Sequence, residues 1–230
     1  MRVTKLTLGP HDNNVYIVAC ERTGESVVID ASFDAAPIVA ATAGTQVRAI
    51  LLTHGDLDHI DALTDLKEQL GVPVGIHADD ADRLDTPPDF LLGEGEPFAV
   101  GDGVLRIIHT PGHTAGSVGF HFDDTLIAGD TLFPGGPGAT RGDKVRFAQI
   151  IDSIREKLFI LSDATLVRPG HGVDTTIGTE RPHLQEWIER GWLGWGGGQE
   201  GGRAANGGRL KPRLGALTRH ETALRRLDSL

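Results

Sequence analysis

The feature that most restricts the fold is the heptapeptide THGDLDH at residues 53–59, which joins two different periodic patterns. The apolar run VRAILLT at residues 47–53 is typical of a strand buried on both faces. Apolar side chains then recur at helical spacing from Ile60 to Leu70. A loop between such a strand and helix lies at the carboxyl edge of a sheet, where α/β proteins usually bind ligands. Its possible metal-binding side chains are His54, Asp56, Asp58 and His59.

Three later side chains occupy the same kind of position, just beyond a predicted strand. His113 lies in TPGHTAGS, Asp130 follows the strand at 125–128, and His171 follows the strand at 165–167. A single histidine of this kind is more often structural, and Asp56 or Asp58 can instead cap the following helix. The repetition of the pattern therefore favours a shared metal site over these separate explanations.

The remaining patterns predict an α/β fold in two halves. Short strands are expected at 3–8, 14–20, 26–30, 72–76, 105–110 and 117–122, and helices near 147–158 and 181–192. Strands and helices alternate in each half, which favours a four-layer αββα sandwich of two mixed sheets flanked by helices.

Composition divides the chain into a domain at residues 1–193 and a tail at 194–230. The tail is rich in glycine and carries seven basic against three acidic residues, a net charge of +4, which leaves −14 for the rest. We expect the tail to be flexible and the domain to repel nucleic acid. The single cysteine, Cys20, excludes an internal disulfide, and no run is long and apolar enough for a signal peptide or membrane span. A cytoplasmic protein without a membrane partner is expected, and its oligomeric state stays open.

In the order of these histidines and aspartates along the chain, the sequence resembles the metallo-β-lactamase superfamily, especially its glyoxalase II-like (hydroxyacylglutathione hydrolase) branch. The family pattern is HxHxDH followed by a later His, an Asp and a His, and the resemblance covers residues 1 to about 192. It implies a catalytic domain with two divalent metal ions, zinc being the usual ion. It also implies that Asp130 bridges the two ions. The implied ligands of the first ion are His54, Asp56 and His113, and those of the second are Asp58, His59 and His171.

Asp56 departs from this pattern, because the family has histidine there. An additional carboxylate weakens Lewis acidity and should raise the pKa of a metal-bound water. It also favours harder ions such as Mn²⁺ or Fe²⁺ over Zn²⁺. An impaired first site that leaves one bound metal is the alternative.

The resemblance implies that a metal-bound hydroxide attacks an ester, thioester or lactone carbonyl of a small-molecule substrate. Asp58 can orient the hydroxide or move its proton. Asp30, the last residue of VVID, resembles the family's buried acid that supports a metal-binding histidine, although it can equally be an exposed strand end. Arg141 and Lys144, both in GGPGATRGDK at residues 135–144, can receive an acidic end of the substrate, although a plain glycine-rich turn is as good an interpretation.

Two other functions remain open at this point. The extra carboxylate gives some support to a mononuclear iron enzyme resembling persulfide dioxygenases. A degenerate, non-catalytic metal-binding module is the third possibility, if Asp56 has ended catalysis.

Overall fold

The computed structural model describes residues 1–192, and the first sheet is formed by strands in chain order. Its strands are β1 (Arg2–Leu8), β2 (Asn13–Ala19), β3 (Glu25–Ile29), β4 (Gln46–Leu51), β5 (Val74–His77) and β6 (Phe90–Leu92). Strands β1 to β3 pair antiparallel, and β3 to β6 pair parallel. The connections carry the helices α1 (Ala35–Ala41), α2 (Leu57–Ile60) and α3 (Leu63–Leu70) and the 3₁₀ helix η1 (Ala78–Arg83).

The second sheet uses the following part of the chain. Its strands are β7 (Pro97–Val100), β8 (Gly103–His109), β9 (Val118–Phe122), β10 (Thr125–Gly129), β13 (Leu166–Pro169) and β14 (Thr175–Thr176). The order is β14-β13-β10-β9-β8-β7, and only β10 and β13 are parallel neighbours. A small hairpin pairs β11 (Leu132–Phe133) with β12 (Gly136–Pro137). The helical segments are α4 (Lys144–Ser153), the π-helical turn η2 (Ile154–Leu158), α5 (Ile177–Glu180), η3 (Arg181–His183) and α6 (Leu184–Arg190).

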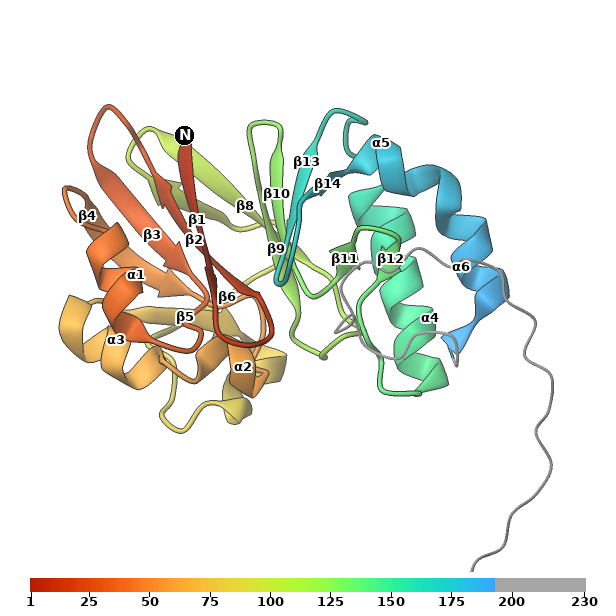
Figure 1. The fold of residues 1–230 in the computed structure, drawn as a ribbon, viewed down its shortest axis with the longest axis horizontal. Coiled ribbons are helices and arrows are strands. Elements are labelled where there is room, and N and C mark those ends of the chain that lie inside the picture. Colours follow the sequence, from red (N-terminus) through yellow and green to blue (C-terminus); the bar gives the residue numbers. More distant parts are fainter. Residues whose placement is uncertain (193–230) are drawn as a thin grey trace, which may run out of the picture.

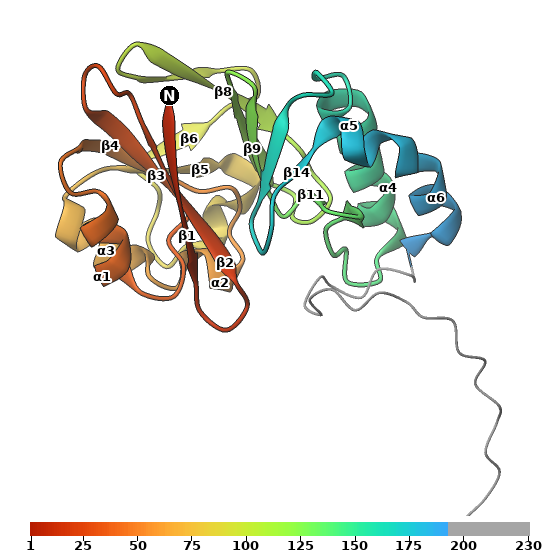
Figure 2. The ribbon, with the colours of Figure 1, turned by 45° about the horizontal axis from the view of Figure 1, so that its top comes forward.

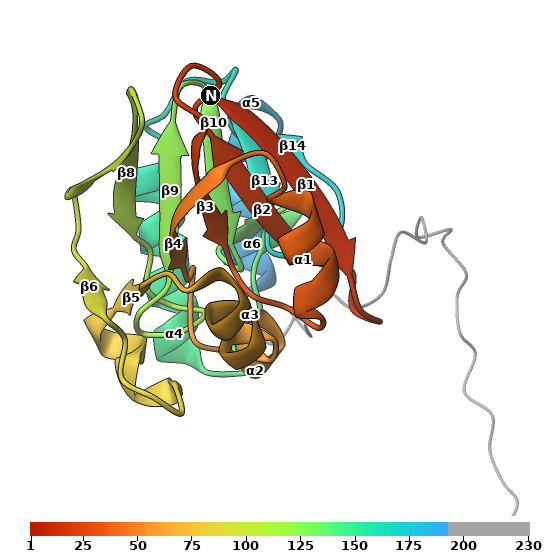
Figure 3. The same ribbon diagram turned by 90° about the vertical axis from the view of Figure 1, so that its left-hand side faces the viewer.

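Three apolar cores separate four layers. One core lies between the two sheets and contains Ile29 and Leu51 from the first and Phe120 and Ile127 from the second. A second joins the first sheet to α1 and α3, and a third joins the second sheet to α4, η2, α5 and α6. Figure 1 shows these helices on the outer sides of the facing sheets, and Figures 2 and 3 show the layers from two other directions. The predicted four-layer αββα sandwich is confirmed.

The predicted helix over Ile60 to Leu70 is divided in two, because the chain between its parts bonds to another segment. The backbone N–H of Ala62 donates to the carbonyl of Ala31 at 2.9 Å. The carboxylate of Asp61 accepts from the backbone N–H of Phe33. Helix α3 ends at Gly71, whose φ of 65° is the left-handed conformation that glycine adopts at helix ends. The loop that carries the predicted donors therefore runs into a single helical turn, α2.

Among residues 1–192, no helix is long and apolar enough to cross a bilayer. The predicted flexible tail at 194–230, and the last residue of the predicted domain, lie outside the described residues.

Candidate metal centre

The loop after β4 carries four of the predicted donors, and its backbone is shaped by contacts with η1. Gly55 lies against Arg83, and a Cβ at Gly55 would come within 2.8 Å of the Cβ of Arg83. The backbone N–H of Gly55 donates to the carboxylate of Asp80 at 2.8 Å. Asp56 occupies the N-cap position of α2, but its side chain makes no capping hydrogen bond. The helix-capping explanation of this carboxylate is therefore wrong, and the side chain is available to the site.

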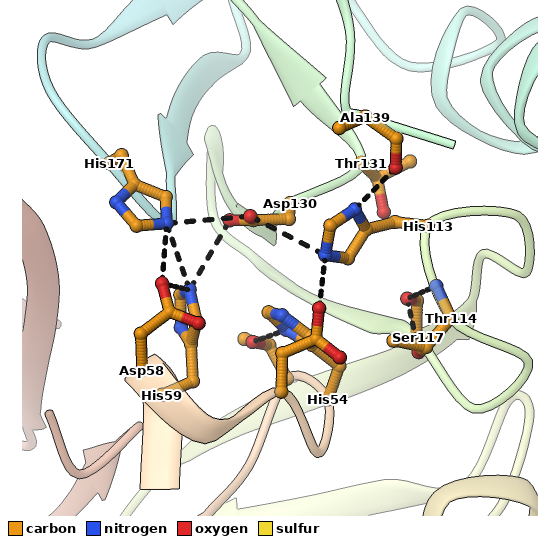
Figure 4. A network of polar contacts seen from close by, with 12 residues as sticks. His54, Asp58, His59, His113, Thr114, Ser117, Asp130, Thr131, Ala139 and His171 are labelled. Carbon is orange, nitrogen blue, oxygen red and sulfur yellow. Dashed lines mark hydrogen bonds and ion pairs between the residues drawn. The ribbon is translucent and has the colours of Figure 1, made fainter. Parts of the chain in front are cut away.

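The other three donors come from the second sheet. His113 lies in the turn between β8 and β9, Asp130 directly follows β10, and His171 follows β13. Because β10 and β13 are parallel, their carboxyl ends lie at the same edge of the sheet. In Figure 4, His171, Asp130 and His113 approach from one side, and Asp58, His59 and His54 approach from the other. The structure thus brings together side chains that are up to 117 positions apart in the sequence.

The seven predicted ligands form two adjoining groups, each compact enough for one cation. His54, Asp56 and His113 form one group, and Asp58, His59 and His171 form the other; within each, one ligand atom per residue lies within 4.8 Å of the rest. Asp130 contacts both groups. Its Oδ1 is 3.5 Å from His59 Nε2, and its Oδ2 is 3.6 Å from His113 Nε2. This is the position that a carboxylate bridging two ions would occupy.

Each of the four histidines has its Nδ1 bonded to an oxygen atom. The partners are the Thr53 hydroxyl for His54, the Asp30 carboxylate for His59, the Ala139 carbonyl for His113 and the His11 carbonyl for His171, at 2.8–3.0 Å. Carboxylate and carbonyl acceptors hold a proton on Nδ1 of His59, His113 and His171, and the Thr53 hydroxyl, which donates to Asp30, can accept one from His54. The Nε2 atom of each ring is therefore the one turned toward the centre.

Three of the inward-facing atoms lack a hydrogen bond within the described part of the chain. Nε2 of His54, Nε2 of His113 and Oδ1 of Asp130 are buried without a hydrogen bond. The Nε2 atoms of His59 and His171 face each other at 3.1 Å. Buried polar atoms normally have a partner, and converging lone pairs on nitrogen and carboxylate oxygen are the ligands of divalent cations. The residues present therefore fit a two-metal centre.

The electrostatics of the group follow from its burial and its carboxylates. Burial and the neighbouring histidines hold the pKa of His54 well below its ordinary value, so its imidazole is neutral. Burial also lowers the pKa of His59, but Asp130 and the hydrogen bond to Asp30 outweigh it and raise the pKa to about 9. Burial favours a protonated Asp130, yet the surrounding histidines hold the pKa of this carboxyl far below its usual range. The metal-free site thus pairs an imidazolium with a buried carboxylate.

Asp30 is buried, at 1% exposure, so the exposed strand-end alternative is wrong. Its carboxylate accepts from the backbone N–H of Thr53 at 2.8 Å and from the Thr53 hydroxyl at 2.8 Å. The same carboxylate lies 3.0 Å from Nδ1 of His59. Asp30 adopts φ 66°, a left-handed conformation that is uncommon for a residue other than glycine. Its side chain therefore fixes the ring of His59 and the start of the THGDLDH loop together.

The two predicted substrate-binding cations lie differently. The Arg141 side chain is 56% exposed, and its Nη2 donates to Oδ2 of Asp56. Lys144 is exposed at the start of α4. Sequence reasoning did not find Arg83, which bonds Asp56, or Asn13, which bonds both the backbone and the carboxylate of Asp58. No local pattern marks either residue, although Asn13 begins the NNVYIV strand.

One further group of possible ligands lies outside the centre. His77, Asp79 and His109 offer atoms within 4.8 Å of one another. The two imidazoles are stacked, with centroids 4.0 Å apart and planes 12° from parallel. Ring nitrogens direct their lone pairs within the ring plane, so stacked rings do not converge on one ion. His109 Nε2 is bonded to the carbonyl of Ala115, as expected for a structural histidine.

An αββα sandwich with histidines and aspartates gathered where its two sheets meet defines a class of metal-binding α/β proteins. The sequence profile of the metallo-beta-lactamase superfamily matches residues 8–171. The chain belongs to this superfamily.

Known proteins similar to this chain include a probable metallo-hydrolase and a hydroxyacylglutathione hydrolase. The probable metallo-hydrolase YqgX of Bacillus subtilis is 32% identical, over 79% of this chain and 95% of its own length. The hydroxyacylglutathione hydrolase GloC of Haemophilus influenzae is 37% identical, over 59% of this chain and 73% of its own length. Among solved structures, ETHE1 from Myxococcus xanthus has a TM-score of 0.74 at 27% identity and covers 83% of this chain and 89% of its own.

Proposed function

We propose that this metallo-beta-lactamase superfamily protein hydrolyses an ester, thioester or lactone of a small molecule at a two-metal centre. The observation that carries the proposal is the convergence of four histidine Nε2 atoms and three aspartates in two adjoining groups, with Asp130 between them. Similarity to a hydroxyacylglutathione hydrolase and a probable metallo-hydrolase supports the reaction class. When bound, the metal ions supply Lewis acidity toward the substrate carbonyl and activate water as the attacking group.

Within this proposal, Asp58 positions the attacking water and accepts its proton. Its side chain is 39% exposed, so water and substrate can reach it, and its Oδ2 lies 3.4 Å from Nε2 of His171. Asn13 holds the same oxygen at 3.0 Å. A carboxylate fixed beside the ligand atoms is suited to orient a water molecule and to act as a general base. No side-chain nucleophile is required.

Arg141 and Lys144 are proposed to contact an acidic part of the substrate. Both are exposed, and Arg141 bonds Asp56 through one nitrogen of its guanidinium. Guanidinium and ammonium groups bind carboxylates through charge-assisted hydrogen bonds.

The second candidate is the persulfide dioxygenase-like reaction at a single iron. Asp56 gives the first group an additional hard ligand, and the similarity to ETHE1 is compatible with this candidate. The two candidates differ in metal content and in oxygen consumption, so one set of assays separates them.

The test combines metal analysis with a substrate panel. The purified full chain should bind close to two divalent ions and cleave at least one of S-lactoylglutathione, a generic thioester and a set of lactones. Oxygen uptake with glutathione persulfide and one bound iron would decide for the second candidate. Failure on the whole panel with metal bound would leave the non-catalytic binding module, and an Asp56→His variant that gained activity would then establish it.

A further inference from the structure

Asp56, the residue that departs from the family pattern, is held between two guanidinium groups. Arg83 donates to its Oδ1 at 3.0 Å, and Arg141 donates to its Oδ2 at 2.5 Å. The Asp56 side chain is 9% exposed. His113 Nε2 lies 3.1 Å from Oδ2. Both carboxylate oxygens of Asp56, which could bind a metal ion in the first group, therefore already accept a hydrogen bond from an arginine.

The backbone is adapted to both contacts. On one side, Gly55 has no Cβ, and η1 approaches closely enough for Arg83 to reach the adjacent Asp56. On the other, Arg141 adopts φ 55°, a left-handed conformation that is costly for a residue with a side chain. The two arginines belong to separate elements and reach the same carboxylate from different directions.

The arginines change the charge of the site relative to the sequence expectation. Asp56 adds a third carboxylate to the two of the family pattern, and this alone would weaken Lewis acidity. Arg83 and Arg141 place two positive charges directly on that carboxylate. The net charge around the first group of ligands is therefore less negative than the charges of His54, Asp56 and His113 alone would give.

We propose that Arg83 and Arg141 are resident counter-ions of Asp56, which share its carboxylate with a bound metal ion. They stabilise the metal-free site, because a buried carboxylate without a partner is strongly destabilising. They also weaken cation binding, because their positive charges repel the cation and their N–H groups compete with it for the Asp56 carboxylate. The inference rests on the proposed metal centre but not on the hydrolysis of any substrate, and it is tested without an activity assay.

This role predicts effects of opposite sign when an arginine is replaced. Arg83→Gln should lower the unfolding midpoint of the metal-free protein by about 5 °C, because Asp56 loses a partner. The same change should tighten the binding of Mn²⁺ or Zn²⁺ to the first group by roughly tenfold. Arg141→Gln should act in the same directions but less strongly, because its side chain is more exposed. An arginine that merely supports the scaffold would lower stability and metal affinity together.

The experiment is a double-mutant cycle with Asp56→Asn, which removes the charge and keeps the shape. Thermal unfolding of the metal-free full chain and competition with a fluorescent chelator measure the two properties for each variant. In the Asp56→Asn background, Arg83→Gln should lower the midpoint by much less than in the native background, because only the longer pair of Arg83 with Asp80, at 3.8 Å, is then lost. Arg155→Gln is the matched control, because Arg155 bonds Asp152 at 2.6 Å on an exposed surface. It should change neither property.

Two outcomes overturn the proposal. One is an equal loss of stability from Arg83→Gln in the native and Asp56→Asn backgrounds, which would make Arg83 a scaffold residue. The other is an unchanged or weakened metal affinity in Arg83→Gln, which would mean that the arginine does not compete with the cation. Neither depends on whether a substrate is found, so failure here leaves the proposed hydrolase function standing.

Discussion

Asp30 combines burial, an uncommon backbone conformation and hydrogen-bond contacts with three groups, although it is not one of the proposed metal ligands. The sequence suggested its role only through the resemblance of VVID to a family feature. The structure supplies the physical reason, since the carboxylate bonds Thr53 and Nδ1 of His59 at the same time.

Replacing Asp30 with alanine should therefore weaken metal binding by about 10–100-fold, because the ring of His59 loses the acceptor that fixes it. Chelator competition on the purified variant measures the change. Asp34→Ala is the control, since Asp34 accepts from the backbone N–H of Ala36 at the start of α1, outside the proposed ligand set. That control should lose about 1 kcal/mol of stability and keep its metal affinity. An Asp30→Ala protein with native affinity would contradict the assigned support role.

The raised pKa of His59 predicts how metal affinity depends on pH. With a pKa of about 9 in the metal-free protein, the imidazole carries a proton at neutral pH, and a cation must displace that proton. Affinity should therefore rise with pH, by up to about tenfold per unit, and level off above pH 9. Calorimetry in buffers of different ionisation enthalpy should detect the released proton at pH 7.5. An affinity that is flat from pH 6 to 9 would show that the pKa is not raised.

At the residue scale, the seven proposed ligands could be predicted because motif and strand-end position mark each of them. Arg83 could not, because its contact with Asp56 joins positions 27 apart through the approach of η1. Asn13 likewise meets Asp58 across 45 positions. Contacts of this kind depend on how the elements pack, and the sequence on either side of Arg83 or Asn13 does not specify that packing.

At the scale of elements, strong periodic patterns located the long strands and the helical region near 147–158, whereas the helix predicted from Ile60 to Leu70 is divided in two and α1 was not predicted. Short pieces such as β6, β12 and β14 have two or three residues, too few for a periodic pattern. Trp187 and Ile188 are neighbouring apolar residues in the helical region predicted near 181–192, but Ile188 is 38% exposed, whereas Trp187 is 1% exposed. Adjacent residues of a helix point about 100° apart, and in α6 the packing directs Trp187 into the core and leaves Ile188 partly exposed.

Gly170, after β13, shows how closely an element approaches the centre. A Cβ at this position would collide with Oδ1 of Asp130 and would lie 2.7 Å from Cε1 of His59. Gly170→Ala should therefore displace the proposed bridging carboxylate and lower metal affinity by roughly tenfold or more, measured by chelator competition.

Gly71→Ala is the matched control for Gly170→Ala. A Cβ at Gly71 meets nothing within 4 Å, although its φ is +65°. This control should lose about 1 kcal/mol of stability through backbone strain alone and keep its metal affinity. Equal metal affinity in the two variants would show that Gly170 is not part of the centre.

At the scale of the whole molecule, the proposed centre joins two halves of the fold. The first sheet contains the strands of residues 2–92, and the second contains those of residues 97–176. Four of the proposed ligands follow β4 in the first half, and three follow strands of the second.

Removal of metal should lower the stability of the whole chain, because cations bind the folded arrangement of ligands and not the separated segments. At a free metal concentration 100 times the Kd, binding adds about 2.7 kcal/mol to the free energy of unfolding. Urea unfolding with added Mn²⁺ or with a chelator measures this difference. Identical midpoints in the two conditions would mean that the ligands do not bind a cation as a group.

The connection between β6 and β7 is the single point where the described chain passes from one sheet to the other. An ion held by His54, Asp56 and His113 would form a second crossing, closing a loop through both sheets. A disulfide also restricts the unfolded chain, whereas a bound ion stabilises the folded arrangement because it binds that arrangement alone. With only one cysteine, this chain cannot make an internal disulfide, and its metal centre would cross-link the two sheets as well as provide the proposed site of reaction.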